Sequence, residues 1–451
     1  MRSDLSALIR KRPWRAVATA AGLAAVFAVS LPDAAEAKTE ARIRWERMCQ
    51  IRADKFDLVL PEAMRGNGID MWITVMKEGL RDPLWDDLGR GYVGNIGYYI
   101  FTDRGGDRIE RVAIGTGGYK LERCGVYDQV LGSADLAEFV RERDPQRIGV
   151  NMSRSIGAAD GLSHTSWLHL RETLGEPYAD RFVSAEKLIS DFRSRRVASE
   201  IVAFGEAGEW SRNIAERAFS NEVITPGVTA LEDVAWWIEQ QLLENGLDTS
   251  FGIPSIYITG PTGIEATSNE RIIQRGDLLM IDWGVGYLNM YTDMKRIAYV
   301  LKDGEVAAPP GIQNAFDRGR AARDVIRRTI KPGPTAGAML EQLAEELTAA
   351  GFQMIEFNQP TDDDTTDVVV GCHSVGNLGH GIGPSIAWFN PTRLEYEIVP
   401  TNMFAIELFA YTKAEEFGGA KVRIPLEDDA IVTERGVEWF YPANDRILLI
   451  R

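Results

Sequence analysis

The first part of the chain alternates helical stretches with short runs of β-branched and aromatic residues. Such runs, bounded by turn-forming residues, are typical of strands in a half-buried sheet. Residues 71–75, 97–101, 111–115 and 147–151 predict four strands of this kind. We therefore expect residues 38–184 to form one α/β domain of ordinary size.

A second region, residues 185–451, repeats one pattern twice. A long amphipathic helical stretch (199–219) leads through a Pro-Gly turn into a second helical run (231–245), and β-rich sequence follows. The same order recurs with residues 314–328 and 337–350. This indicates two related halves about a pseudo-twofold axis, with coincidence as the alternative because the shared motif is short. A site between two such halves would take residues from both.

Two acidic residues follow one of the apolar runs. The run ends in Asp282, a glycine-containing turn comes next, and Asp293 stands eleven residues after Asp282. In a hairpin, two such carboxylates lie close together and repel each other unless divalent cations lie between them. The alternative is one buried acid and one surface turn residue. The spacing makes Asp282 and Asp293 candidate metal ligands.

The C-terminal part adds histidines and further carboxylates. His373 and His380 are two of the four histidines, and glycines stand between them. Glu407 interrupts an apolar run, where a carboxylate without a partner is costly, and Glu427 stands in a second β-like run. Four carboxylates and one imidazole form a hard donor set, suited to Mn²⁺, with Co²⁺, Fe²⁺ or Zn²⁺ as alternatives.

Five of these residues, taken in order, resemble the ligand set of the pita-bread family, which includes methionine aminopeptidase, aminopeptidase P, prolidase and creatinase. They are Asp282, Asp293, His373, Glu407 and Glu427. The resemblance implies an α+β chain with a C-terminal pita-bread domain of two pseudo-symmetric helix–strand halves and an N-terminal creatinase-like α/β domain. It also implies two divalent metal ions per chain and a metallopeptidase activity, most similar to that of Xaa-Pro aminopeptidases and dipeptidases.

The resemblance leaves two registers open for the histidines. In the family a catalytic histidine follows the metal-binding histidine by seven residues, which makes His373 the ligand and His380 the catalytic acid or base. The alternative makes His380 the ligand, because residues 379–383 resemble a methionine aminopeptidase string, and leaves Ala387 at the catalytic position. The first register keeps both histidines in use and is preferred. Glu407 is then the carboxylate beside the nucleophile.

Two positions depart from the family pattern. Glu265 stands where many members have a histidine, and Leu408 stands where they usually have a proline. We assign Glu265 and Arg423 to the substrate-facing part of the site. The departures keep two alternatives open, namely another amide or amidine hydrolase on the same fold and a peptide-binding homologue with impaired catalysis.

The first residues predict a signal peptide over residues 1–37. A basic flank that ends at Arg15 precedes the small-residue apolar run 16–31, and an A-x-A pattern closes the segment at residues 35–37. An uncleaved membrane anchor is the alternative, but the run is short for a span and no basic flank follows it. We therefore expect an exported protein, periplasmic or secreted, that is not attached to a membrane.

Charge and cysteine content restrict the partners further. The formal charge of −16 and the lack of a clustered basic stripe argue against nucleic acid. The resemblance implies a peptide as the partner, and a homodimer is left open. Three cysteines are too few for a disulfide scaffold. Cys49 and Cys124 either form one bridge in an oxidising compartment or remain buried thiols. We interpret Cys372 as a packing residue rather than a nucleophile.

Overall fold

The computed structural model describes residues 38–451 apart from residues 262, 267–269, 357–358 and 378–381. The chain divides into two units, Met1–Ile43 and Arg44–Arg451. The predicted signal peptide, residues 1–37, lies outside the described residues. Within the described part of the chain, no helix combines the length and the apolar character needed to cross a membrane.

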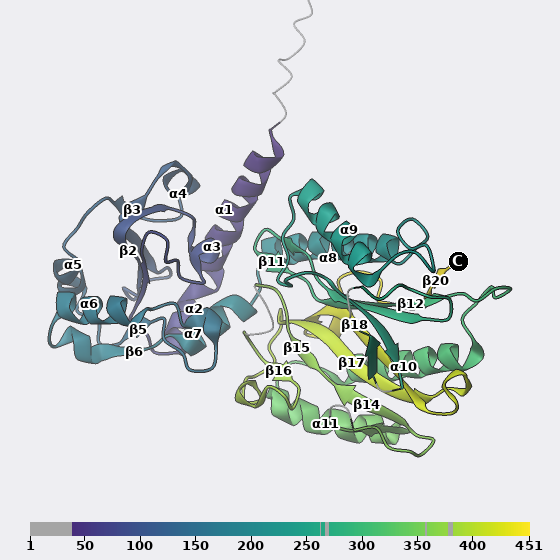
Figure 1. The fold of residues 1–451 in the computed structure, drawn as a ribbon. Helices are drawn as coiled ribbons and strands as arrows, with labels where there is room; N and C mark the ends of the chain where they lie inside the picture. Colours follow the sequence, from purple (N-terminus) through teal and green to yellow (C-terminus); the bar gives the residue numbers. More distant parts are fainter. Residues whose placement is uncertain (1–37, 262, 267–269, 357–358, 378–381) are drawn as a thin grey trace, which may run out of the picture. The chain divides into compact units, whose positions relative to one another are not determined.

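A six-stranded sheet forms in the first part of the larger unit (Figure 1). Its order is β4-β3-β2-β1-β5-β6, with β1 and β3 antiparallel to β2 and the other neighbours parallel. All six residues of β1 are buried, which explains why its sequence, MWITVM, is almost entirely apolar. The strands are β1 (Met71–Met76), β2 (Tyr92–Thr102), β3 (Glu110–Gly117), β4 (Gln129–Leu131), β5 (Ile148–Val150) and β6 (Phe182–Ser184).

Short helices accompany this sheet, and the four strands predicted from the sequence are confirmed as β1, β2, β3 and β5. β2 begins at Tyr92, before the predicted run 97–101, and an irregularity between Val93 and Tyr98 interrupts its pairing with β3. The helices are α1 (Glu40–Leu58), α2 (Leu60–Gly66), α3 (Trp85–Leu88), α4 (Tyr119–Cys124), α5 (Leu136–Arg143) and α6 (His164–Leu174).

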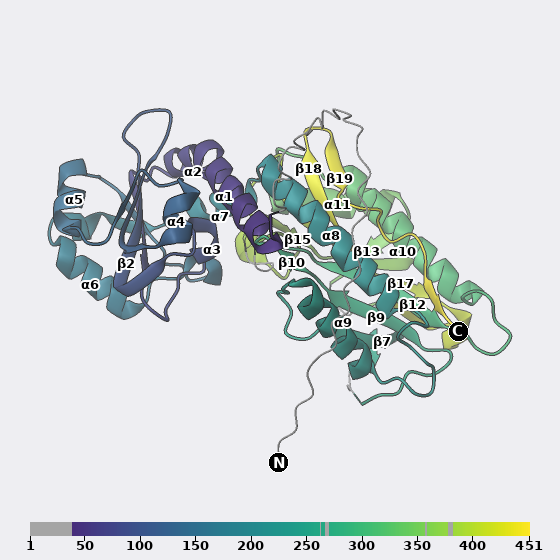
Figure 2. The ribbon, with the colours of Figure 1, turned by 90° about the horizontal axis from the view of Figure 1, so that it is seen from above.

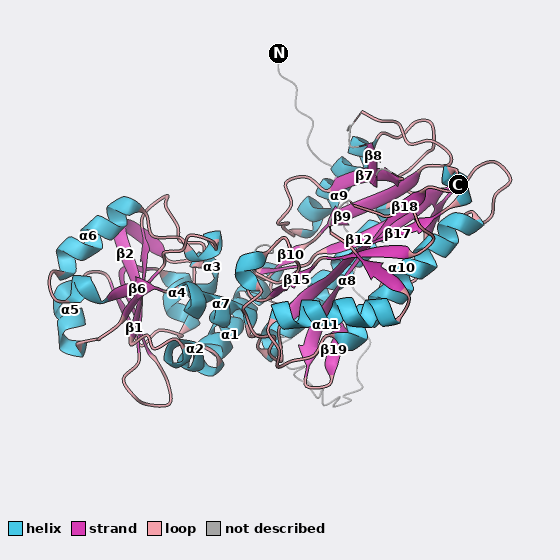
Figure 3. Ribbon diagram, turned by 90° about the horizontal axis from the view of Figure 1, so that it is seen from below, coloured by secondary structure: helices cyan, strands magenta, loops and turns pink. Residues whose placement is uncertain are grey.

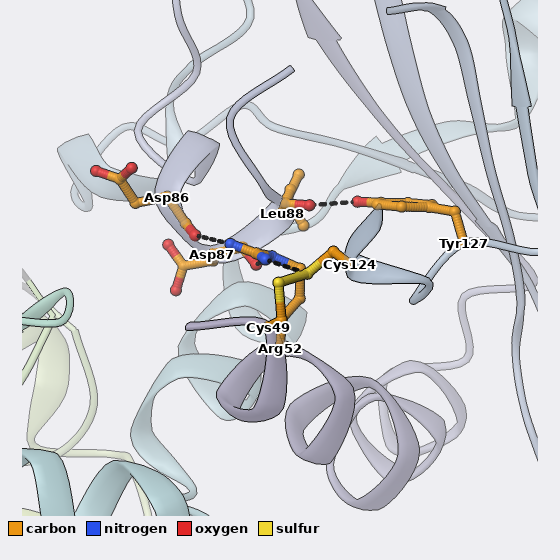
Figure 4. Close-up of a disulfide and its surroundings, with 7 residues drawn as sticks. All are labelled: Cys49, Arg52, Asp86, Asp87, Leu88, Cys124 and Tyr127. Carbon is orange, nitrogen blue, oxygen red and sulfur yellow. Dashed lines mark hydrogen bonds between the residues drawn. A yellow bond between two sulfur atoms is a disulfide. The ribbon is translucent and has the colours of Figure 1, made fainter. Parts of the chain in front are cut away.

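A disulfide bond joins Cys49 in α1 to Cys124 at the end of α4 (Figure 4). Beside it, the guanidinium of Arg52 donates hydrogen bonds to the carbonyl oxygens of Asp86 and Asp87, both at 2.9 Å. Burial lowers the pKa of Arg52. The bond therefore ties α1 to α4, and Arg52 ties α1 to the α3 segment. Of the two alternatives for these cysteines, the structure shows the bridge.

A twelve-stranded sheet forms the second part of the larger unit. Its main order is β13-β14-β17-β18-β12-β9-β7-β8; β15 pairs with β16 and β17, β19 with β18, and β20 with β12. The strands are β7 (Ser255–Gly260), β8 (Gly263–Ala266), β9 (Leu278–Trp283), β12 (Met294–Val300), β13 (Phe352–Met354), β14 (Thr366–Val370), β15 (Cys372–Ser374), β16 (Ser385–Ile386), β17 (Met403–Lys413), β18 (Lys421–Thr433), β19 (Gly436–Trp439) and β20 (Leu448–Ile450). A separate hairpin pairs β10 (Gly286–Tyr287) with β11 (Met290–Tyr291).

Two helix pairs pack along this sheet (Figures 2 and 3), and the predicted repeat of helix, turn and helix is confirmed. Thr335 fixes the start of the last helix, since its hydroxyl accepts the N–H of Ala338 at 3.3 Å. Gly246 ends the second helix of the first pair with a φ of 57°, where glycine is favoured. The helices are α7 (Glu186–Ser194), which precedes the pairs, then α8 (Ala198–Ala218) with α9 (Leu231–Asn245), and α10 (Pro310–Thr329) with α11 (Ala336–Ala349).

The third cysteine, Cys372, is a buried free thiol in the hydrophobic core of the larger sheet. Burial raises the pKa of this thiol well above its ordinary value, so it is protonated at neutral pH. Both facts agree with its interpretation as a packing residue.

Loss of the disulfide is expected to destabilise the protein, because the bond restricts the unfolded chain between Cys49 and Cys124. Replacing both cysteines by serine should lower the free energy of unfolding by about 2–4 kcal/mol, measured by urea denaturation. Reductant should shift the wild-type midpoint in the same direction and leave the double variant unchanged. Equal midpoints for the wild type and the double variant would show that the bond contributes nothing.

Candidate metal centre

Four charged side chains lie in one row across four adjacent strands. These strands are neighbours in the order β17-β18-β12-β9. Backbone pairing sets Glu407 opposite Glu427, and Glu427 opposite Lys295. Lys295 is in turn opposite Asp282. Because directly paired residues point to the same face of a sheet, three acids and one base share one surface.

The sequence of β17 explains why Glu407 faces this surface. Its neighbours Ile406 and Leu408 pack into the core that includes the apolar side of α10. Alternation along a strand then turns Glu407 to the opposite face. Leu408, which stands where the family usually has a proline, is therefore a core residue on the side of β17 away from the charged row.

Asp293 and His373 complete one half of the cluster. Asp293 immediately precedes β12, and His373 lies in β15, where it pairs with Ala405 of β17. The Nε2 atom of His373 lies 3.2 Å from Oε1 of Glu427, 3.8 Å from Oδ2 of Asp293 and 3.9 Å from Oε2 of Glu407. Ligand atoms of Asp293, His373 and Glu427 all lie within 4.8 Å of one another. These carboxylates and the imidazole fit one hard divalent cation.

Lys295 fills the other half of the cluster. Its Nζ atom lies 3.2 Å from Oδ2 of Asp282, 2.7 Å from Oε1 of Glu407 and 2.5 Å from Oε2 of Glu427. Only 3% of the Lys295 side chain is exposed. One buried ammonium therefore pairs with three of the five predicted ligands. The sequence analysis missed Lys295, although its place two residues after Asp293, on the same face of a strand, was a usable signal.

The electrostatics of the cluster follow from these contacts. Burial lowers the pKa of Lys295, but the charges of Asp282, Glu407 and Glu427 outweigh it and raise that pKa well above its ordinary value. Burial also lowers the pKa of His373, whereas the hydrogen bond with Glu427 and the nearby carboxylates raise it to about 9. Burial raises the pKa of Glu427, yet the charge of Lys295 and the contact with His373 lower it overall. Positive charge is thus favoured at both ends of the cluster.

Two further buried acids, also missed from the sequence, support the centre. The carboxylate of Asp429 accepts the backbone N–H of Asp293 at 3.3 Å and the hydroxyl of Tyr441 at 2.8 Å. Burial raises the pKa of Asp429 well above its ordinary value. Asp428 accepts a hydrogen bond from buried Arg296 at 2.8 Å. The run Glu-Asp-Asp inside an apolar stretch of β18 was the available signal.

The other predicted site residues have different surroundings. Arg423 is buried in β18, its guanidinium lies 4.0 Å from the centre of the Phe409 ring, and its position four residues before Glu427 puts it on the same face. Glu265 is exposed in β8, which β7 separates from β9. His380 lies outside the described residues. The catalytic and substrate-binding roles of these three residues stay predictions.

Comparison with protein families supports the interpretation of this centre. The model of metallopeptidase family M24 matches residues 203–434, which contain all five predicted ligands. A comparison with curated protein sequences found no match.

Solved structures share the fold of the chain. An X-Pro aminopeptidase from Thermotoga maritima superposes with a TM-score of 0.63 at 17% identity, covering 86% of this chain and 99% of that one. A Xaa-Pro dipeptidase from Bacillus anthracis gives 0.61 at 19% identity, with 89% and 99% covered. A prolidase from Pyrococcus horikoshii gives 0.58 at 18% identity, with 88% and 99% covered. These likenesses confirm the predicted pita-bread fold.

The preferred register, with His373 as the ligand and His380 as the acid or base, predicts different effects for the two histidines. His373→Ala removes an imidazole from the cluster and should weaken Mn²⁺ binding by at least the ~10–100-fold typical of residues that only support ligands. His380→Ala should leave Mn²⁺ affinity unchanged. Calorimetric titration of the folded variants measures both. Weaker binding confined to His380→Ala would make His380 the ligand and overturn the preferred register.

Proposed function

Because the chain belongs to metallopeptidase family M24, we propose that it is an exported peptidase that cleaves the bond before proline at the N-terminus of peptides. The observation that carries this proposal is the buried cluster of Asp293, His373, Glu407 and Glu427 on the pita-bread sheet. The family depends on divalent metal ions, and these are the residues that would hold one.

The donors suggest both the metal and the chemistry. Carboxylates with a single imidazole favour a hard ion, so we propose Mn²⁺. When bound, such an ion polarises a carbonyl and lowers the pKa of water toward neutrality. Oε2 of Glu407 lies 3.9 Å from Nε2 of His373, so it faces the space between His373 and Glu427 where the ion would bind. From there Glu407 is proposed to orient the nucleophile and take its proton. His380 is proposed to protonate the leaving nitrogen.

The substrate class rests on similarity of fold. The structures described above are an X-Pro aminopeptidase, a Xaa-Pro dipeptidase and a prolidase. At 17–19% identity these structures show a common fold. That this chain acts on the same class of peptide is our proposal. Buried Arg423, on the face that carries Glu427, is the cationic group proposed to meet the peptide. Glu265, exposed in β8, is the second residue proposed to contact the peptide.

Export is supported by two independent features. The basic, apolar and A-x-A succession of residues 1–37 has the order of a signal peptide. The bond between Cys49 and Cys124 suits an oxidising compartment, since such bonds are rare in the cytosol. We therefore propose that the mature protein begins near Lys38 and acts in the periplasm or outside the cell.

The substrate proposal predicts selective turnover. Mature protein supplied with Mn²⁺ should hydrolyse Xaa-Pro dipeptides or Xaa-Pro-Xaa tripeptides and leave matched Xaa-Ala peptides intact. Whether the dipeptides or the tripeptides react faster distinguishes a dipeptidase from an aminopeptidase. Release of the first residue is followed by chromatography. Bound Mn²⁺ without turnover of any peptide would instead favour the peptide-binding alternative.

The export proposal predicts the mature N-terminus. Sequencing of the protein recovered from the periplasm or the medium should give a first residue at or near Lys38. A full-length protein that begins at Met1 in the soluble cytoplasmic fraction would contradict export.

A further inference from the structure

The cluster has two cation positions, because two carboxylates divide their oxygens between them. Glu427 directs Oε1 toward His373, at 3.2 Å, and Oε2 toward Lys295, at 2.5 Å. Glu407 does the same, with Oε2 at 3.9 Å from His373 and Oε1 at 2.7 Å from Lys295. Carboxylates that divide their oxygens in this way are the usual bridging ligands between two cations. One position has Asp293 and His373 as its further donors, and the other has Asp282.

The position next to Asp282 contains the ammonium of Lys295. Backbone pairing fixes this arrangement, because Lys295 stands directly between Asp282 on β9 and Glu427 on β18. Its side chain therefore points into the carboxylate row, where only 3% of it is exposed to solvent. We propose that Lys295 serves as a built-in second cation, so that the centre binds one divalent ion rather than two.

A second divalent ion would compete with Lys295 for the same oxygens. Paired ions in two-metal sites lie about 3.5–4 Å apart and share bridging carboxylates. Here the ammonium of Lys295 contacts the two glutamates in the place that the second ion would need. An incoming ion would have to move the ammonium out of contact with three carboxylates. The centre of the Phe409 ring lies 5.6 Å from Nζ and would compensate the ammonium much less than the three carboxylates do.

The two aspartates then have different roles. Asp293 acts as a metal ligand, whereas Asp282 is the counter-ion of Lys295 and lies outside the coordination sphere. Lys295 is then a positioning residue, because it holds Glu407 and Glu427 with their remaining oxygens directed toward the single ion. This inference rests on the proposed function only in requiring that the centre binds metal. It is independent of the peptide that the protein cleaves.

Metal stoichiometry tests the proposal directly. Mature protein dialysed against excess Mn²⁺ should retain one ion per chain by elemental analysis, and its electron paramagnetic resonance spectrum should lack exchange coupling between two ions. Lys295→Ser, which removes the ammonium and opens its space, should bind two ions per chain and show that coupling. Lys295→Arg keeps the positive charge and should bind one.

A matched control exists on the same sheet. Lys421 is also a buried lysine, with Nζ 2.8 Å from Asp367, and Lys421→Ser should leave the stoichiometry at one. Two ions in the wild type, no ion in the wild type, or one ion in folded Lys295→Ser would each overturn the proposal. The wild-type result alone is decisive if Lys295→Ser fails to fold. One bound ion with no peptide turnover would contradict the proposed function and leave this inference standing.

Discussion

Compensation of buried negative charge is the constraint on which the centre depends. Asp293, Glu407 and Glu427 are exposed by only 5%, 9% and 0%, and each would be costly in that environment as an isolated carboxylate. Lys295 offsets part of the charge from within the sheet. The negative charge that Lys295 does not offset lies around His373, which contacts Glu427. The raised pKa of His373 has the same cause, namely the nearby carboxylates. A divalent ion bound at this point would offset the remaining charge and so stabilise the folded chain.

The fold satisfies this constraint by drawing strands from both repeated halves. β9 and β12 follow the first helix pair and contribute Asp282 and Lys295, and Asp293 lies directly before β12. β15, β17 and β18 follow the second pair and contribute His373, Glu407 and Glu427. Neither half holds the complete donor set, so the centre exists only when β12 and β18 are paired.

One short run of β18 links the centre to the rest of the domain. Glu427 faces the cluster, and Asp429 fixes the backbone of Asp293 while it accepts the hydroxyl of Tyr441. Asp428 points the other way and pairs with buried Arg296 and Arg323 at 2.8 and 3.0 Å. Breaking a buried pair of this kind typically costs about 3–5 kcal/mol, because it leaves an uncompensated charge. The position of the cluster therefore also depends on the buried Asp428 pairs on the other face of β18.

The features predicted correctly from the sequence are those that depend on residues close together in the chain. Helices α8 to α11 lie within a few residues of their predicted bounds, because amphipathic periodicity and Pro-Gly turns mark them. The carboxylates were found because charge inside an apolar run is costly. The role of Lys295 was missed because it depends on the pairing of Lys295 with Glu427 across two strands. Pairing between strands so far apart in sequence has no local signature. The pairing of Cys49 with Cys124 was left open for the same reason.

Anomalous scattering from crystals grown with Mn²⁺ tests the central claim most directly, because it locates each ion among the named side chains. The account predicts one anomalous peak, between Asp293, His373, Glu407 and Glu427, with the ammonium of Lys295 against Asp282 on the far side of the two glutamates. A second peak beside Asp282, with Lys295 turned away from the cluster, would contradict it.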